Sequence, residues 1–272
     1  MPGPRYVSDV WPSAHKDDRV YVTLDGHRSD DFAPYVFVSE DRGATWRFVG
    51  HDLAANEPVH AIAEDPRREG LLYLGTEFGA WVTFDGGERW APLGSGLPTV
   101  CVRDLCIQDR DSDLVAGTHG RGVWILDVQP LRQWNKTAAD AAAHLFQPED
   151  AILWRMSSRG AQGHRNYAAP NPSYGATFHL HLATAPESAP VLTIHDVKGD
   201  KVAELKGKAE AGLQALQWDA RTNSRLAPAG TYSVRHEHGG KTTARAFALH
   251  PDPGTTPVEP GALEPTTPLS RE

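Results

Sequence analysis

Three apolar runs that each end in an aspartate recur along the first half of the chain. They end at Asp41, Asp85 and Asp127, which are 44 and 42 residues apart. Val, Tyr, Phe, Trp and Thr dominate these runs, as is typical of β-strands. A repeat of ~40–50 residues that holds four strands is typical of a propeller blade. The first half therefore predicts a partial β-propeller of about three four-stranded blades.

The repeat extends upstream of each aspartate. Gly75-Thr76 aligns with Gly117-Thr118, and segment 59–66 aligns with segment 102–109. Each unit is predicted to run strand, turn, strand, turn, strand, aspartate turn, strand. The aspartate turn then joins the third and fourth strands, and the loop between the second and third strands opens on the opposite rim.

The first aspartate turn carries the full pattern S-x-D-x-G-x-T-W, known as an Asp box. The second copy keeps its Asp, Gly and Trp, and the third keeps only its Asp. A short acidic side chain can accept hydrogen bonds from the N–H groups of its own turn, and glycine suits a position with positive φ. We therefore interpret the box residues as structural rather than as an acid/base pair: Ser39, Asp41, Gly43, Thr45, Trp46, Asp85, Gly87, Trp90 and Asp127.

These repeats resemble the bacterial neuraminidase-repeat family, which includes sialidases, xyloglucanase-type glycosidases and the sortilin propeller. The segments DGHRSDDFAPYVFVSEDRGATW, LYLGTEFGAWVTFDGGERW and GTHGRGVWILD are similar to the C-terminal blades of large exported bacterial proteins labelled sortilin-like or "glycosyl hydrolase". The match covers roughly residues 5–135. The resemblance implies a longer propeller, a periplasmic or extracellular parent protein, and the remaining blades of that parent as partners.

The second half carries a different pattern. We expect the propeller part to end at 135, an Ala-rich linker over 136–143, and a β-sandwich of seven short strands over 144–250. Residues 251–272 hold six prolines and are expected to form a disordered tail. The segments GATFHLHL, LTIHDVKGDKV and LAPAGTYSV resemble the immunoglobulin-like domain of the flagellar hook-capping protein. The whole chain is thus expected to be all-β.

Charged loop residues supply the candidates for a ligand face. The loops between the second and third strands of the three units carry His27, Asp30, Asp31, Glu77, His119 and Arg121. If they converge, they could bind a divalent ion or a polar sugar. We favour the alternative that these charges are solvated or paired between blades, and we assign no metal, no cofactor and no catalytic residue.

Several function classes are disfavoured by the sequence. The formal net charge of −8, with no run of Lys or Arg, argues against a nucleic-acid partner. No apolar stretch approaches the ~18–20 residues of a membrane span, and the start lacks the apolar core of a signal peptide. Cys101 and Cys106 lie roughly 16 Å apart if their segment is a strand, so we expect two free, buried thiols.

We interpret the chain as a non-catalytic binding or scaffold fragment of a larger exported propeller protein, with a protein or a polysaccharide as its ligand. The alternative is a fragment of a sialidase- or xyloglucanase-like glycoside hydrolase whose active site is completed by missing blades. A glycosidase needs two carboxylates at a fixed separation across the scissile bond, and no such pair can be placed in this sequence.

Overall fold

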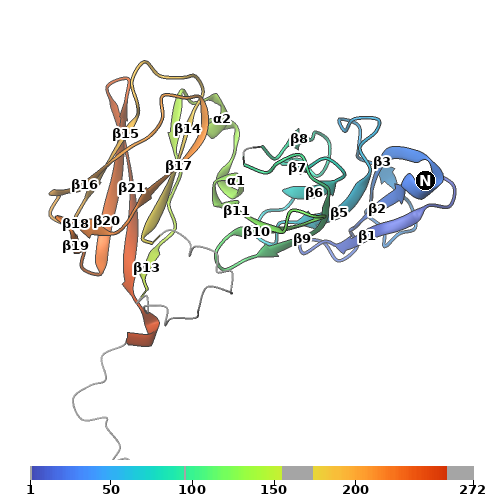
Figure 1. Ribbon diagram of the computed structural model, residues 1–272, viewed down its shortest axis with the longest axis horizontal. Coiled ribbons are helices and arrows are strands. Elements are labelled where there is room, and N and C mark those ends of the chain that lie inside the picture. The colour runs from blue at the N-terminus through green and yellow to red at the C-terminus, as the bar shows by residue number, and fades with distance from the viewer. Residues whose placement is uncertain (1, 95, 155–173, 256–272) are drawn as a thin grey trace, which may run out of the picture. The chain divides into compact units, whose positions relative to one another are not determined.

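The structure is a computed structural model that describes residues 2–94, 96–154 and 174–255 (Figure 1). The prediction of an all-β chain is confirmed. Contacts between Cα atoms divide the chain into two compact units, Met1–Arg132 and Gln133–Glu272. Among the described residues, no helix is long and apolar enough to cross a membrane.

The first unit consists of three antiparallel sheets, each built from strands consecutive in the chain. Blade 1 contains β1 (Tyr6–Pro12), β2 (Val20–Gly26), β3 (Asp31–Ser39) and β4 (Arg47–Phe48), with a 3-10 turn η1 (His27–Ser29) between β2 and β3. Blade 2 contains β5 (Val59–Glu64), β6 (Leu72–Thr76), β7 (Ala80–Thr83) and β8 (Ala91–Pro92). Blade 3 contains β9 (Val102–Gln108), β10 (Asp113–Thr118) and β11 (Val123–Asp127).

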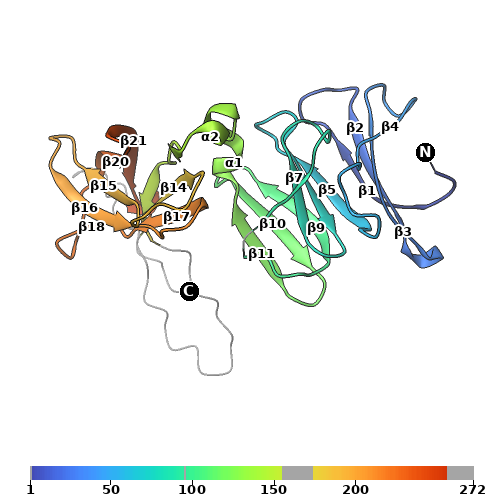
Figure 2. The same cartoon turned by 90° about the horizontal axis from the view of Figure 1, so that it is seen from above.

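Blade 3 has three strands rather than the four of the repeat. After Asp127 the chain enters a short helix, α1 (Gln129–Gln133), so no fourth strand pairs with β11 among the described residues. The first strands of the three blades, β1, β5 and β9, lie next to one another (Figure 2). The first unit is therefore a partial propeller of two complete blades and one three-stranded blade.

The blades stack through two apolar layers. We call the face that a blade turns to the next blade its forward face, and the opposite one its back face. The first layer joins the forward face of blade 1 to the back face of blade 2: Tyr21, Val36 and Val38 against Val59, Ile62, Leu72 and Leu74. The second joins blade 2 to blade 3: Ala61, Ala63, Tyr73, Ala80 and Val82 against Val102, Leu105, Leu114 and Ala116.

A glycine allows the close approach of blades 2 and 3. A Cβ atom at Gly75 would lie 2.7 Å from the carbonyl oxygen of Val102 and 2.8 Å from its Cγ1. The equivalent Gly117 of blade 3 is not so crowded, because a Cβ there would lie 3.5 Å from the Asp104 Cβ. Only the first of these two glycines therefore has a neighbour that excludes a side chain.

This difference predicts opposite outcomes for the same substitution in two equivalent positions. Gly75→Ala should lower the free energy of unfolding of the first unit by about 1–3 kcal/mol, because it overpacks the contact with Val102. Gly117→Ala should change it by less than about 0.5 kcal/mol. Urea unfolding followed by the methyl signal of the buried Ile62 measures both. Equal effects would contradict the close approach of the two blades.

The second unit is a β-sandwich of two main sheets. One sheet contains β12 (Ala143–Leu145), β14 (Ala176–Leu182) and β17 (Gly212–Trp218). The other contains, in spatial order, β13 (Ala151–Leu153), β21 (Lys241–Pro251), β20 (Gly230–His238), β15 (Val191–His195) and β16 (Lys201–Lys206). A small hairpin pairs β18 (Arg221–Thr222) with β19 (Arg225–Leu226).

The inner faces of both main sheets share one core. Trp218 lies within it, 2% exposed, and contacts the rings of Tyr232 and Phe247. Its indole N–H donates to the carbonyl of Arg221 over 3.1 Å. Trp218 is therefore a core residue that leaves no exposed platform for a sugar.

The two ends of the sandwich differ from the expected segments. The expected linker, 136–143, contains helix α2 (Lys136–Asp140), which is N-capped because the Asn135 side chain accepts a hydrogen bond from the Ala138 N–H. The first residues of the expected disordered tail, 251–272, are ordered. Pro251 is the last residue of β21, and a 3-10 turn, η2 (Pro253–Thr255), follows it. The remainder of that tail, 256–272, lies outside the described residues.

Candidate functional site

The first aspartate turn is held by its own side chains. The Asp41 carboxylate accepts hydrogen bonds from the Ser39 hydroxyl (2.8 Å), the Thr45 N–H (2.8 Å) and the Thr45 hydroxyl (2.6 Å). The Ser39 hydroxyl in turn accepts the Gly43 N–H over 2.7 Å. The hydrogen bonds from Thr45, followed by the one from Ser39, lower the pKa of Asp41 to about 2. All of these partners lie within the turn, which supports a structural role.

The second aspartate turn repeats this arrangement and adds a contact to blade 1. The Thr83 hydroxyl and the Arg89 N–H donate to Asp85. Trp90 is buried, and its indole N–H donates to the Val49 carbonyl over 2.6 Å. Gly87 has φ +95°, and a Cβ there would lie 2.9 Å from the Val49 Cβ. The second turn thus packs on blade 1. In the third turn, Asp127 accepts a hydrogen bond from the backbone N–H of Gln129, the first residue of α1.

A cluster of ionisable side chains lies at the opposite rim, where all three blades contribute. We call it the rim cluster: Asp25 and His27 from blade 1, His60 and Glu77 from blade 2, and Cys101 and Arg103 from blade 3. His60 and Arg103 occupy equivalent positions, each at an irregularity of the first strand that leaves it out of the pairing register. The bulges turn both side chains to the rim.

His60 is the centre of this cluster. Its Nε2 lies 2.9 Å from Glu77 Oε2, and its Nδ1 lies 3.1 Å from an Arg103 guanidinium nitrogen. Burial lowers the pKa of His60. The ring is therefore neutral at pH 7, and because Arg103 can only donate, Nδ1 is the acceptor and Nε2–H donates to Glu77.

The other members complete an internally paired network. Asp25 Oδ2 lies 2.5 Å from His27 Nδ1 and 3.6 Å from His60 Nδ1. Burial favours a higher pKa for Glu77, but hydrogen bonds from His60 and Cys101 and the charge of Arg103 outweigh it and lower that pKa. Burial raises the pKa of the Cys101 thiol to about 11, so it stays protonated at pH 7.

Three side chains of the rim cluster, those of His60, Glu77 and Cys101, each have an atom that could coordinate a metal ion. The ligand atoms of His60, Glu77 and Cys101 lie within 4.8 Å of one another. However, the Arg103 guanidinium donates to His60 and lies 3.7 Å from Glu77, where it would repel a cation. A metal on His60 Nε2 would also require a proton on Nδ1, which already accepts from Arg103. The geometry suits a paired polar network better than a metal site.

The structure brings together two of the six loop residues expected at a ligand face. His27 and Glu77 both belong to the rim cluster. Asp31 instead pairs with Arg5 (2.7 Å) and accepts the Tyr35 hydroxyl (2.8 Å). Asp30 ends η1 with φ 55°. The last two, His119 and Arg121, lie in the loop between β10 and β11 of blade 3. The backbone N–H of His119 donates a hydrogen bond to the Cys101 carbonyl, and the Arg121 side chain is exposed.

The two thiols were both expected to be free and buried. Both are free, but only Cys101 is buried, and Cys106 is exposed. Cys106 pairs with Val115 in the ladder and lies on the forward face of blade 3. The expectation of burial was wrong for Cys106 because that face is not covered as the forward faces of blades 1 and 2 are.

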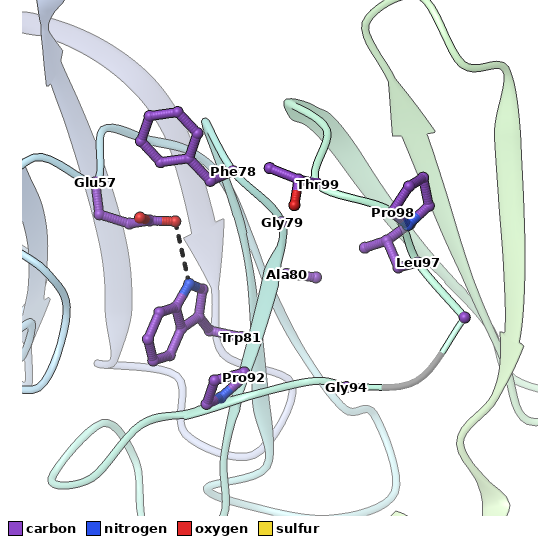
Figure 3. A pocket seen from close by; sticks show the side chains of 11 residues that line it. Glu57, Phe78, Gly79, Ala80, Trp81, Pro92, Gly94, Leu97, Pro98 and Thr99 are labelled. Atoms are coloured by element: carbon purple, nitrogen blue, oxygen red, sulfur yellow. Dashed lines mark hydrogen bonds between the residues drawn. The ribbon is translucent and has the colours of Figure 1, made fainter.

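A pocket of about 390 Å³ lies in the first unit between blade 2 and the segment that leads from β8 to blade 3 (Figure 3). Apolar and aromatic residues make up much of its lining, including Phe78, Trp81, Leu97 and Pro98, and Thr99 adds a polar side chain. Among the described lining residues, Glu57 is the only charged one. Its Oε1 accepts hydrogen bonds from the Thr76 hydroxyl and, over 3.3 Å, from the Trp81 indole N–H. The side chain is therefore fixed at the wall by hydrogen bonds to one of its two oxygens.

The comparisons with known proteins give only remote similarities. No protein-family model and no curated protein matches the chain. Three of the solved structures to which the chain is similar are described here. PorZ, a surface component of the type-IX secretion system of Porphyromonas gingivalis, is 12% identical over 89% of this chain and 38% of its own, with a TM-score of 0.33. The GH74 enzyme of Niastella koreensis has the same identity and coverage and a TM-score of 0.36.

The third solved structure is YCF48 bound to a D1 peptide. It is 11% identical over 91% of this chain and 68% of its own, with a TM-score of 0.36. The chain thus spans 38% of the length of the first two proteins.

Proposed function

We propose that this chain is a non-catalytic binding unit of an exported propeller protein, and that its pocket takes a basic side chain of a partner protein. The observation that supports this proposal is the pocket between blade 2 and the segment that leads to blade 3. It combines apolar and aromatic walls with one fixed carboxylate, that of Glu57, and no basic residue among its described lining.

The chemistry of the pocket favours a lysine or arginine over a neutral ligand. An aliphatic stem can pack on Phe78, Leu97 and Pro98, while the cationic head meets the carboxylate. Burial of Glu57 strengthens this attraction because the local dielectric constant is lower than in water. Aromatic side chains also attract cations through their ring faces. A protein segment with an exposed basic residue is therefore the proposed ligand.

Replacing the charge while keeping the shape tests this proposal. In Glu57→Gln the amide oxygen can still accept from Thr76 and Trp81, so only the charge is lost. Binding of a short peptide with one lysine between neutral residues should weaken about tenfold to a hundredfold, the usual value of a hydrogen bond to a charged group. The exposed Glu88, which pairs with Arg47, supplies the control Glu88→Gln, which should bind normally.

Binding is measured as the change in the NMR signal of the Trp81 indole N–H as the peptide is added. The lysine peptide should shift it, and the same peptide with norleucine in place of lysine should not. If xylo- or gluco-oligosaccharides shift the signal and the peptide does not, the ligand is a polysaccharide and the proposed partner is wrong.

The competing function is glycoside hydrolysis. The carboxylates of Asp31 and Glu77 are each engaged with a cation or a histidine, which supports a non-catalytic role. We expect no turnover of aryl sialosides or of xylo- or gluco-oligosaccharides. Turnover abolished by Asp30→Asn, Asp31→Asn or Glu77→Gln in a folded protein would instead establish the hydrolase.

The remaining parts of the proposal rest on the resemblances in the sequence. We place the first unit in the neuraminidase-repeat family and the sandwich among immunoglobulin-like domains. We also propose a periplasmic or extracellular site for a longer protein in which further blades continue the same stacking. The aspartate turns are proposed to stabilise the blades and to take no part in binding.

A further inference from the structure

The sandwich has a pocket of its own at one end. Its volume is about 500 Å³, within the size range of small-molecule sites. The pocket lies where the loop 183–190 crosses from β14 in one main sheet to β15 in the other. The ends of β14 and β20 and the starts of β15 and β21 form the rest of its lining. The site therefore belongs entirely to the second unit.

His236 lines this pocket and has one nitrogen without a partner. The side chain lies near the end of β20 and is 5% exposed. Its Nδ1 lies 3.2 Å from the carbonyl oxygen of Val191, which can only accept, so Nδ1 carries a hydrogen and donates it. Its Nε2 is buried and has no hydrogen-bond partner among the described residues. Because such an atom is costly in a native protein, it indicates a ligand or an ordered water at this place.

Four further polar side chains of the pocket are free to bind a ligand. Arg235 and Glu237 lie two residues apart on β20, Ser188 lies in the loop before β15, and Thr242 lies on β21. Within the part of the chain that the structure describes, none of these four side chains takes part in a hydrogen bond or an ion pair. The pocket thus offers a cationic donor, an anionic acceptor and two hydroxyl groups.

This combination disfavours charged ligands. Glu237 would repel an inorganic anion, and Arg235 would repel a cationic group. A metal site usually takes about three or four protein ligands. Among the described residues, His236 belongs to no group of three His, Cys, Asp or Glu side chains that could hold a metal ion. A neutral ligand with several hydroxyl groups meets none of these objections, because each hydroxyl can both donate and accept.

We propose that this pocket binds a neutral saccharide. A sugar hydroxyl can donate to His236 Nε2 when the ring is neutral and accept from it when the ring is charged. Adjacent hydroxyls of the sugar can bind Arg235 and Glu237, while its C–H groups pack on the apolar part of the lining, which includes Pro186 and Pro190. The site goes beyond the proposed function, because it lies in the other unit and takes a different class of ligand.

The test is a titration of the full chain with a panel of neutral oligosaccharides of glucose, xylose, galactose and mannose, followed by NMR. At least one of them should shift the imidazole nitrogen signals of His236 and the methyl signals of Leu182, which also lines the pocket. In His236→Asn the amide can still donate to Val191 but Nε2 is lost, so binding should weaken about twofold to tenfold. Arg235→Met removes a charged donor and should weaken binding about tenfold to a hundredfold.

The matched control is Arg225→Met, because Arg225 is exposed on β19 and does not line the pocket. This variant should bind the saccharide normally, and circular dichroism and cooperative unfolding check that all three variants are folded. The absence of a shift with every member of the panel would refute the saccharide site, as would shifts produced only by zinc or by inorganic phosphate. Binding that is unchanged in both His236→Asn and Arg235→Met would show that the saccharide binds elsewhere and would refute the site as well.

This test is independent of the one for the proposed function. The lysine peptide is followed by the Trp81 signal in the first unit, and the saccharide is followed by the His236 signals in the second. A chain that binds the peptide and no saccharide would refute only the sandwich site. A chain that binds a saccharide at His236 and no peptide would refute only the proposed partner.

Discussion

Trp218→Ala is expected to lower the free energy of unfolding of the sandwich by about 3–5 kcal/mol, the usual cost of removing a buried tryptophan. Trp218 is 2% exposed, contacts the rings of Tyr232 and Phe247, and closes the end of β17 opposite Ala176. The surrounding strands cannot collapse onto the cavity without breaking the register of two sheets. This loss is a large fraction of the total stability of a typical domain, which is about 5–15 kcal/mol.

Urea unfolding of the full chain, followed by the methyl signal of Ile194, measures this effect. Ile194 lies in the same core on β15 and therefore reports on the sandwich alone. The matched control is Trp154→Ala, because Trp154 is exposed and should cost little. If both variants unfold at the same urea concentration, Trp218 is not the core residue described above.

Acid should destabilise the sandwich through His179 on β14. Burial lowers the pKa of His179 from 6.5 to about 4. Between these values the unfolded chain binds a proton that the folded chain does not bind, so the free energy of unfolding falls as the pH decreases. Full stability is present above pH 6.5 and about 3 kcal/mol is lost by pH 4. Burial also lowers the pKa of His144 and His181, which act in the same direction.

The variant His179→Leu separates this residue from the rest. It should remove the part of the pH dependence between 6.5 and 4 that His179 contributes, about 3 kcal/mol, whereas replacing the exposed His238 by Gln should keep the whole dependence. The same Ile194 signal is followed at each pH. A pH dependence that is unchanged in His179→Leu would mean that other groups destabilise the sandwich in acid.

The architecture of the first unit was predictable because the repeat is periodic. The aligned aspartates gave the spacing of the blades, and the pair Gly75 and Gly117 marked the second strand of two of them. The number of strands in blade 3 was less accessible, because α1 replaces a strand after Asp127 without a break in composition. The helix α2 was hidden for a similar reason, since an Ala-rich segment suits both a linker and a helix.

The rim cluster was predictable only in part. His27 and Glu77 are charged residues in loops, where ligand sites are commonly sought. His60 and Arg103 lie at the starts of strands, and their orientation depends on two bulges that alternation of polar and apolar residues does not reveal. The alignment of segments 59–66 and 102–109 does place His60 and Arg103 at the same position of the repeat, and that was the available signal.

The unequal burial of the two thiols makes the protein suitable for labelling at a single position. At neutral pH, Cys101 remains a protonated, buried thiol, since burial raises its pKa to about 11. A maleimide probe should therefore react at Cys106, which is exposed on the forward face of blade 3. A fluorophore or spin label attached there would report directly on whatever covers that face, without any cysteine being introduced or removed.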